Sequence, residues 1–465
     1  MKKLLCLAFA LLLTMTTLFS VACGKGGNNG DKPSGGGDTP SEKIVIDIDK
    51  DISADITIAV PGGNSNERTM IKCLIDDFAE MYPNVNIDMS FVTVNSYVSD
   101  VMNLAAAQKA GKDVMPDILW TNSPDYLEIA DAGIYEDLTP YIEATEQAGK
   151  MNFEEEFYTE YFRMGELKGK KYVVPRSCDS IVTFINTELF EKAGIDMTKV
   201  KNGWTWETFM DVCAQMRSWM DKNGKADCYV IDANLTTWLS VCYPMLSAYG
   251  SEPIDDNGKN SISNAKTMQC LEMVREMVNK KYICDTQNAT TKSFENGGSA
   301  MIFQSASVSV YADKLALKNK IDLVSFPLIT VNNTPKIGAG IAGYSIAKTS
   351  KNKNVAWAFL RYLLSKDGQQ KMALNGLNLA SIRKDLSDYT TANWGLKYKD
   401  LNLAAYTYGS EYKTACEFFT KADLSAKADI QKAIQTMFAG ASNASKDLTK
   451  VMATAKADID DALIF

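Results

Sequence analysis

The chain has 465 residues, of which 46% are hydrophobic and 23% are charged, a composition typical of a globular protein with two or three domains. Histidine does not occur, which excludes Ser-His-Asp and Cys-His catalysis and His-containing metal sites. The formal net charge of −8 has the wrong sign for binding a nucleic acid backbone. We expect no nucleic acid partner and no cofactor.

The first residues predict export and lipid attachment. Met1–Lys3 is positively charged and Leu4–Val21 is apolar, which is typical of a secretory signal peptide over residues 1–22. Ser20–Cys23 resembles a bacterial lipobox, in which the cysteine receives a diacylglyceryl group and the preceding bond is cleaved. An uncleaved membrane helix is the alternative, but the apolar stretch is short for a span. We predict lipidation, with palmitate as an acyl chain, at Cys23.

A tether follows the lipidation site. Residues 23–43 contain mainly Gly, Asn, Asp, Ser, Pro and Lys, so they have too little apolar surface to order themselves and predict a flexible linker. No later stretch combines the length and apolarity of a membrane span. We therefore expect the body of the protein to be anchored at the extracellular face of the cell membrane.

Eight cysteines remain after Cys6 and Cys23, and they contain no C-x-x-C pair. Several lie in apolar surroundings, as Cys73 does between Ile71 and Leu74, so we expect buried free thiols. One or two disulfides are the alternative in an extracellular chain.

The first part of the body alternates strands and helices. Asp55–Val60 and Val85–Phe91 alternate in polarity as strands do, and Pro116–Trp120 predicts a third strand. Between these strands, apolar residues recur at helical spacing over Met70–Met81, and a second helix is predicted over Tyr97–Lys109. This order predicts an α/β fold with a parallel sheet and right-handed crossovers.

Later segments repeat the alternation. Gly203–Lys281 is predicted to be mainly helical, and strands return at Ala300–Phe303, Asp322–Phe326 and Tyr344–Ala347. This order predicts two α/β lobes, with the chain passing between them more than once.

Ligands of open α/β sheets bind in the crevice at the carboxyl ends of the strands. In this chain those ends point to Asn64–Glu67 and Thr121–Asp125, which are loops rich in amides and hydroxyls. These two segments are the first candidates for a binding site.

Three motif matches fail on context. Gly338–Gly343 reads G-x-G-x-x-G, but a strand follows it instead of a helix, and position 363 is not acidic as a dinucleotide site requires. We expect these glycines to provide backbone flexibility where the chain crosses or lines a cleft. Asp47–Asp51 and Asp221–Lys225 begin like calcium loops, but both fail at required positions, so no metal site is predicted.

Four further segments resemble the motifs of one protein family. Gly169–Arg176 with Ile181–Ile195 resembles a "G-x-x-Y-x-x-P … YN-x-x-L-F-x-x-A-G-I" signature, and Trp204–Phe209 resembles a T-W-x-x-F helix start. Phe294–Met301 resembles an F-x-x-G-x-x-A-M strand entry, and Gly340–Gln369 resembles a Gly-rich strand that meets an "A-W-x-F-L … G-Q" helix. The chain therefore resembles the family 1 extracellular solute-binding proteins of ABC transporters.

The resemblance implies a two-lobed periplasmic-binding-protein-like fold with parallel-sheet lobes and a multi-crossover hinge. Lobe 1 would comprise residues 55–176 and 336–375, and lobe 2 would comprise residues 177–328 and 377–465. The implied role is that of a monomeric, lipid-anchored receptor, not an enzyme. It would capture a mono- or oligosaccharide between the lobes and deliver it to an ABC permease.

Sugar sites combine aromatic faces with carboxylates, amides and Arg. Trp120 and Tyr311 are aromatic candidates, with burial in the core as the alternative for each. Gln304–Ser307 stands where maltodextrin-binding relatives carry a Gly-Pro-Trp turn, which argues against maltodextrin as the ligand. The predicted ligand-binding residues are Asn64, Asn66, Glu67, Asn122, Ser123, Arg176, Asp179, Trp238, Tyr243, Gln304, Ser305, Gly340, Tyr344 and Trp394.

Two alternatives accompany these predictions. Arg176 and Asp179 are expected to face the cleft close to the hinge. The alternative is that they only form a salt bridge with each other at the surface. A lipid-anchored glycoside hydrolase is the alternative function, because paired carboxylates need no histidine. Only the abundance of Asp and Glu favours it, since no paired-carboxylate motif stands out.

Overall fold

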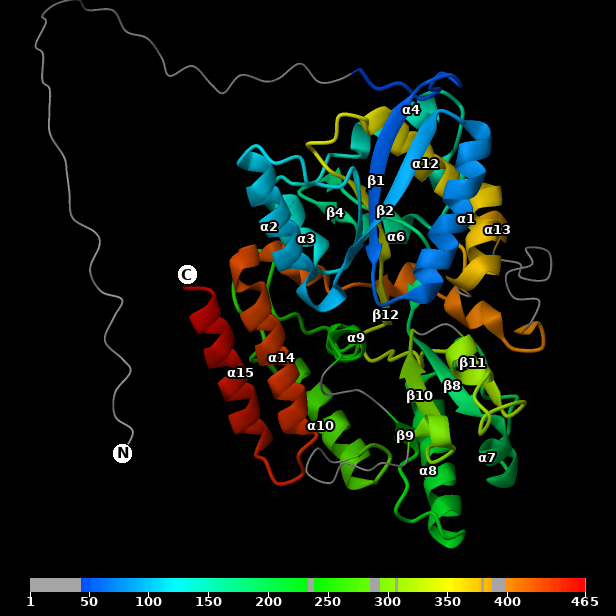
Figure 1. Ribbon diagram of the computed structural model, residues 1–465. Helices are drawn as coiled ribbons and strands as arrows, with labels where there is room; N and C mark the ends of the chain where they lie inside the picture. The colour runs from blue at the N-terminus through cyan, green and yellow to red at the C-terminus, as the bar shows by residue number, and fades with distance from the viewer. Residues whose placement is uncertain are drawn as a thin grey trace, which may run out of the picture. The chain divides into compact units, whose positions relative to one another are not determined.

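The computed structural model describes residues 43–232, 238–284, 293–305, 308–377, 380–386 and 398–464. The predicted signal peptide, Cys23 and Trp394 lie outside the described residues. The residues from Ile44 onward form one unit in which helices alternate with short sheets (Figure 1).

The first sheet has five strands in the order β2-β1-β3-β13-β6. Its strands are β1 (Ala54–Pro61), β2 (Val85–Val92), β3 (Ile118–Asn122), β6 (Val174–Pro175) and β13 (Ala342–Ile346). Strand β1 runs parallel to β2 and β3, which confirms the parallel pairing predicted from the order of the first elements. Strand β13 returns antiparallel to β3 and β6, so the complete sheet is mixed.

Helices cover this sheet because each presents an apolar stripe to it. Helix α1 (Ser65–Met81) buries Met70, Ile71, Leu74 and Phe78, the spacing that predicted it. In Figure 1, α1 lies beside α12 (Lys353–Leu364) and α13 (Lys366–Met372), whereas α2 (Tyr97–Lys109) and α3 (Tyr126–Asp131) lie together on the other side of the strands.

The second sheet has the order β11-β8-β10-β9. Its strands are β8 (Val182–Asn186), β9 (Ile231–Asp232), β10 (Met301–Gln304) and β11 (Ile321–Ser325). Strand β8 is antiparallel to both β10 and β11, which corrects the expectation of parallel sheets in both lobes. No helix directly precedes strand β8 in the chain. None is needed, because antiparallel neighbours do not require a crossover helix.

Six helices belong to the same part of the molecule as the second sheet. They are α7 (Thr187–Lys192), α8 (Trp206–Lys222), α9 (Leu239–Ala248), α10 (Ala265–Asn279), α14 (Lys427–Ala441) and α15 (Leu448–Ala462). Helix α14 packs against α9, α10 and α15, so the last two helices of the chain belong with this part of the molecule.

A three-stranded sheet links the two larger ones. Its strands are β7 (Asp179–Ser180), β12 (Ile337–Gly340) and β14 (Lys413–Thr414), in the order β14-β12-β7. Strand β7 lies in the chain between β6 of the first sheet and β8 of the second, and β12 directly precedes β13. The chain therefore crosses repeatedly between the sheets, as the sequence predicted.

The glycines of the G-x-G-x-x-G segment serve close packing, which corrects the expectation of flexibility. A Cβ at Gly338 would lie 1.7 Å from the Ser240 carbonyl oxygen, and a Cβ at Gly343 would lie 2.0 Å from the Val174 carbonyl oxygen. Both glycines lie in strands and admit a neighbouring backbone that no side chain would allow.

The eight cysteines of the described ranges are all free. Six of them are buried, and Cys73 and Cys284 are half-buried, so the prediction of free thiols is confirmed for these residues. In the part of the chain that the structure describes, no helix has both the length and the apolarity needed to cross a bilayer.

Candidate functional site

The loop between β1 and α1 places two amides at the carboxyl end of β1. Asn64 caps α1, because its side-chain oxygen accepts a hydrogen bond from the Glu67 backbone N–H at 3.1 Å. Asn64 and Asn66 are exposed, whereas Glu67, in the first turn of the helix, is 1% exposed. This loop thus offers polar groups to solvent and sends one carboxylate inward.

Glu67 belongs to a buried cluster that we call the crossover cluster: Glu67, Arg176, Ser177, Asp179 and Tyr344. Arg176 Nε lies 3.0 Å from both Glu67 carboxylate oxygens, and the Tyr344 hydroxyl donates to Glu67 Oε1 at 2.7 Å. Arg176 also donates to the Ser177 hydroxyl at 2.6 Å. The structure therefore brings together predicted residues from α1, β13 and the stretch that runs from the end of β6 into β7.

The charges of the cluster perturb one another. Burial raises the pKa of Asp179, and Arg176 opposes that rise. Burial disfavours the charged form of Arg176, but the Glu67 and Asp179 carboxylates more than offset it and raise the pKa of Arg176. The arrangement keeps a guanidinium charged inside the protein.

Arg176 and Asp179 do not form the surface salt bridge that was the alternative for them. The Arg176 side chain is 8% exposed and pairs with Glu67, and its Nη1 atom lies 4.0 Å from Asp179 Oδ1. The Asp179 side chain is 22% exposed. Asp179 is therefore the least buried charged member of the cluster.

Ser123 and Gly340 lie beside this cluster. The Ser123 hydroxyl accepts from the Ile341 N–H at 3.1 Å, and the Ser123 N–H donates to the Ile341 carbonyl at 2.9 Å. Gly340 pairs with Asp179 in the small sheet, and Asn122 pairs with Ala342 in the first sheet. The end of β3 is thus fastened to the crossover next to Asp179.

The other predicted residues lie on α9 and at the end of β10. Trp238 is half-buried at the start of α9, and Tyr243 is buried with its hydroxyl donating to Glu252 at 2.7 Å. Gln304 ends β10 and Ser305 follows it, and the Gln304 side-chain oxygen accepts from the Ser305 N–H at 3.0 Å. Within the described residues, none of these four is hydrogen-bonded to a member of the crossover cluster.

Two aromatic candidates are core residues. The Trp120 ring packs edge-on against Tyr97 with centroids 5.4 Å apart, and Tyr311 packs against Phe184 at 4.7 Å. Both rings are buried, so the alternative stated for Trp120 and Tyr311, burial in the core, is the one observed. Sequence patterns do not separate a buried aromatic ring from an exposed one.

Phe91 is an aromatic residue that sequence reasoning missed. It is 60% exposed at the end of β2, and it is the only exposed aromatic residue within the described ranges. The Arg68 guanidinium lies 5.9 Å from its ring centroid. Phe91 continues the face of Val85 and Ile87 beyond the buried part of the strand, and its position at the strand's carboxyl end is the signal that could have found it.

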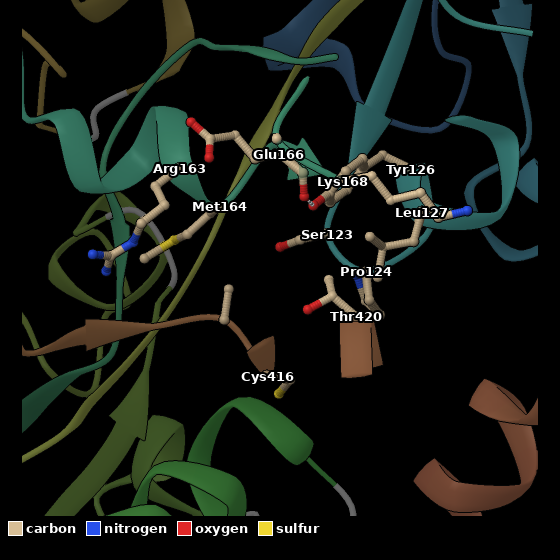
Figure 2. Close-up of a pocket in the computed structure, with 12 residues that line it drawn as sticks. Ser123, Pro124, Tyr126, Leu127, Arg163, Met164, Glu166, Lys168, Cys416 and Thr420 are labelled. Carbon is tan, nitrogen blue, oxygen red and sulfur yellow. Dashed lines mark hydrogen bonds between the residues drawn. The ribbon is translucent and has the colours of Figure 1, made fainter. Parts of the chain in front are cut away.

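A cavity of about 260 Å³ lies where the end of β3 faces the segment after β14. In Figure 2, Ser123, Pro124 and Thr420 lie near one another, and Arg163 and Met164 face them from another wall. Ser123 is the predicted site residue that lines it. The mixture of hydroxyl, charged and apolar groups suits a small polar ligand.

A second charged group, which we call the α3–α14 trio, consists of Asp125, Glu128 and Lys427. Lys427 Nζ lies 2.6 Å from Glu128 Oε1 and 3.8 Å from Asp125 Oδ1. The lysine side chain is 6% exposed, whereas the carboxylate side chains are 31% and 33% exposed. Their i, i+3 spacing could have indicated that Asp125 and Glu128 share a helix face, but nothing local points to Lys427.

Comparison with known proteins gives consistent results. Residues 63–370 match the family described as bacterial extracellular solute-binding protein. The chain is 24% identical over 337 residues to the arabinooligosaccharide-binding protein of Bacillus subtilis (strain 168), covering 70% of this chain and 73% of that protein.

Solved structures share the fold. The sugar-binding protein MalE from the phytopathogen Xanthomonas citri superposes with a TM-score of 0.72 at 16% identity, over 88% of this chain and 98% of that one. The cyclic alpha-maltosyl-1,6-maltose binding protein from Arthrobacter globiformis gives 0.69 at 16% identity, over 88% and 99%. These similarities confirm the two-lobed α/β fold class predicted from the sequence.

Proposed function

The chain belongs to the family of bacterial extracellular solute-binding proteins, and from this premise we propose that it captures a mono- or oligosaccharide for an ABC transporter. The observation that carries the proposal is the convergence of half-exposed and exposed polar side chains at the carboxyl ends of β1 and β3. They lie beside the small sheet through which the chain crosses. The relatives named above support a carbohydrate as the ligand.

The chemistry of these groups suits a sugar. Carboxylates such as Asp179 and Asp125 accept hydrogen bonds from hydroxyl groups, and the amides of Asn64 and Asn66 both donate and accept. The exposed ring of Phe91 offers a flat apolar face to the C–H side of a pyranose or furanose. These groups therefore match the two surfaces that a sugar presents, its hydroxyl groups and its C–H faces.

The crossover cluster gives no support to the glycoside hydrolase alternative. A hydrolase needs one carboxylic acid to donate a proton and a second carboxylate on the other side of the bond. Glu67, the carboxylate in the cluster with Asp179, is occupied by Arg176 and Tyr344. Members of the family bind solutes, and we propose that this chain releases its sugar unchanged.

We also propose the arrangement around the site. Lobe 1 would comprise residues 55–176 and 336–375, and lobe 2 residues 177–328 and 377–465. A lipid on Cys23 and the linker over residues 23–43 would hold a monomeric receptor near its permease. Replacing Cys23 with Ser should abolish fatty-acid labelling of the protein, and label that persists on the variant would contradict the anchor.

The binding experiment uses purified protein and a panel of sugars. Arabino-oligosaccharides, malto-oligosaccharides and their monosaccharides are screened by thermal shift, because a ligand that binds only the folded state raises the unfolding midpoint. Hits are measured by calorimetry, and the sugar is recovered and examined by chromatography. We expect at least one sugar to bind and to be recovered intact.

A matched pair of variants locates the binding. Asp179→Asn should lower the affinity, whereas Asp76→Asn, an exposed carboxylate of α1 with a side chain 59% exposed, should not. If no sugar in the panel binds at millimolar concentration, or if shortened oligosaccharide accumulates above a blank, the proposed function is wrong.

A further inference from the structure

Lys427 is a buried cation in an unfavourable place. It is the first residue of α14, where the helix dipole disfavours positive charge, and the N-cap residue Ala426 provides no side-chain cap. Its side chain is only 6% exposed, and a buried ammonium needs partners to offset its loss of water. The position of Lys427 is therefore explained by the groups that surround it and not by its own helix.

Those groups all come from the end of β3 and from α3. Glu128 Oε1 is 2.6 Å from Lys427 Nζ, Asp125 Oδ1 is 3.8 Å away, and the Pro124 carbonyl accepts at 3.4 Å. Asp125 and Glu128 are three residues apart on a helix surface, where two carboxylates repel each other. One ammonium between them removes that repulsion and fixes both side chains.

The carboxylates keep acceptor capacity that Lys427 does not use. Their side chains are 31% and 33% exposed, and each carboxylate offers about four lone-pair positions. Neighbours of both in the chain, Pro124, Tyr126 and Leu127, line the cavity at the end of β3. Asp125 and Glu128 themselves do not line this cavity, but they adjoin residues that do, and their partly exposed oxygens can accept from a ligand.

The groups facing Asp125 come from α14, α3, β3, α2 and the segment after α3. They are the Lys427 ammonium of α14, the Glu128 carboxylate of α3, the Asn122 amide of β3, and the paired hydroxyls of Tyr97 and Tyr135, which lie 2.7 Å apart. Burial raises the pKa of Asp125, and Glu128 raises it further, whereas Lys427 and Asn122 lower it. Lys427 thus works to keep Asp125 ionised in a site that favours its protonation.

We propose that Lys427 is a positioning residue of the sugar site, which holds the carboxylates of Asp125 and Glu128 as a pair of fixed acceptors for hydroxyl groups of a neutral carbohydrate. The inference rests on the proposed function. The trio carries one positive and two negative charges, so it favours hydroxyl donors over the carboxylate of a sugar acid. Lys427 itself need not touch the sugar.

The test compares affinity for the best-binding neutral sugar across pH 5 to 8. Lys427→Met should bind about five- to twenty-fold more weakly at pH 7, in line with the loss of a charged hydrogen-bond partner. Removing Lys427 raises the pKa of Asp125. As the pH is lowered, Lys427→Met should therefore lose affinity at a higher pH than the wild type does. Lys427→Arg should restore the profile, and Lys432→Met, an exposed lysine of the same helix, should leave it unchanged.

A second variant moves the profile in the opposite direction. Glu128→Gln removes a charge that raises the pKa of Asp125, so the acid loss of affinity should shift to lower pH. A uniform loss of affinity at every pH in Lys427→Met, or a profile that Lys427→Arg does not restore, would assign Lys427 a packing role and overturn the inference.

A ligand-free measurement separates this inference from the proposed function. Carbon-13 NMR titration of the Asp125 carboxyl in the purified protein should give a higher pKa in Lys427→Met than in the wild type. If no sugar binds the wild type, the proposed function fails while this titration still reports on Lys427. An unchanged Asp125 pKa in Lys427→Met would overturn the inference even when sugar binds.

Discussion

The crossover cluster and the α3–α14 trio use the same chemistry with opposite outcomes. Each pairs carboxylates with one cation, yet Glu67 is 1% exposed and bonded to both Arg176 and Tyr344, whereas Asp125 and Glu128 are about one-third exposed. A saturated carboxylate holds elements together, and a half-open one can bind a ligand. Burial and the number of partners, more than residue type, decide which role a charge has.

The largest effect should come from opening the saturated cluster. Arg176→Met leaves the Glu67 carboxylate buried without its cation, so the free energy of unfolding should fall by about 3–5 kcal/mol. Urea denaturation measures this loss. Lys72→Met removes the exposed partner of Asp76 and should cost less than about 1 kcal/mol. A loss below about 1 kcal/mol for Arg176→Met would contradict the role given to the cluster.

A buried lysine near the cluster should make stability depend on pH. Lys413 of β14 is 2% exposed and donates to the Ser180 hydroxyl, and burial lowers its pKa from 10.5 to about 7. Between these values the unfolded chain binds a proton that the folded chain does not, so folded stability rises with pH.

The measurement is the difference in unfolding free energy between the wild type and Lys413→Met at a series of pH values. The unfolding free energy of the wild type minus that of Lys413→Met should increase with pH above 7 by up to about 1.4 kcal/mol per pH unit. The increase should level off near pH 10.5. Parallel stability curves for the two proteins would show that Lys413 stays charged in the folded state.

The half-open carboxylate should affect binding more than folding. Asp125→Asn keeps the shape of the side chain but weakens its acceptor, so we expect the free energy of binding to lose about 1–3 kcal/mol. The free energy of unfolding should change by less than about 1 kcal/mol, because the side chain is 31% exposed. Calorimetry and denaturation measure the two quantities, and the reverse pattern would give Asp125 the structural role of Glu67.

The smallest effect should come from the exposed ring at the end of β2. Phe91→Ala should weaken sugar binding by about 0.5–1.5 kcal/mol if the ring covers a sugar face. Its effect on unfolding should stay within about 0.5 kcal/mol, because the ring is 60% exposed. Unchanged affinity would remove Phe91 from the site.

The sequence predicted the elements well where a local pattern exists. Alternation identified β1 and β2, and apolar spacing identified α1, because strands and helices impose their period on the residues they bury. The two-residue strands β7 and β14 are too short to carry any period, so their pairing around β12 could only be seen in the structure.

The candidate site was predicted in part for the same reason. Asn64 and Glu67 follow a recognisable strand, and their positions could be anticipated from the rule that ligands bind at strand ends. Lys427 reaches the site from 303 residues beyond Pro124, which no local pattern encodes. Composition likewise could not reveal that Trp120 is buried and Phe91 exposed, because burial depends on what packs above each ring.

We propose that this chain holds an intact sugar at the carboxyl ends of β1 and β3. The most direct test is a crystal structure of the protein with the tightest-binding oligosaccharide of the panel. We predict an unbroken sugar within hydrogen-bond distance of the Asp179 and Asp125 carboxylates. A sugar bound elsewhere on the molecule, or one found cleaved at the carboxyl ends of β1 and β3, would contradict this proposal.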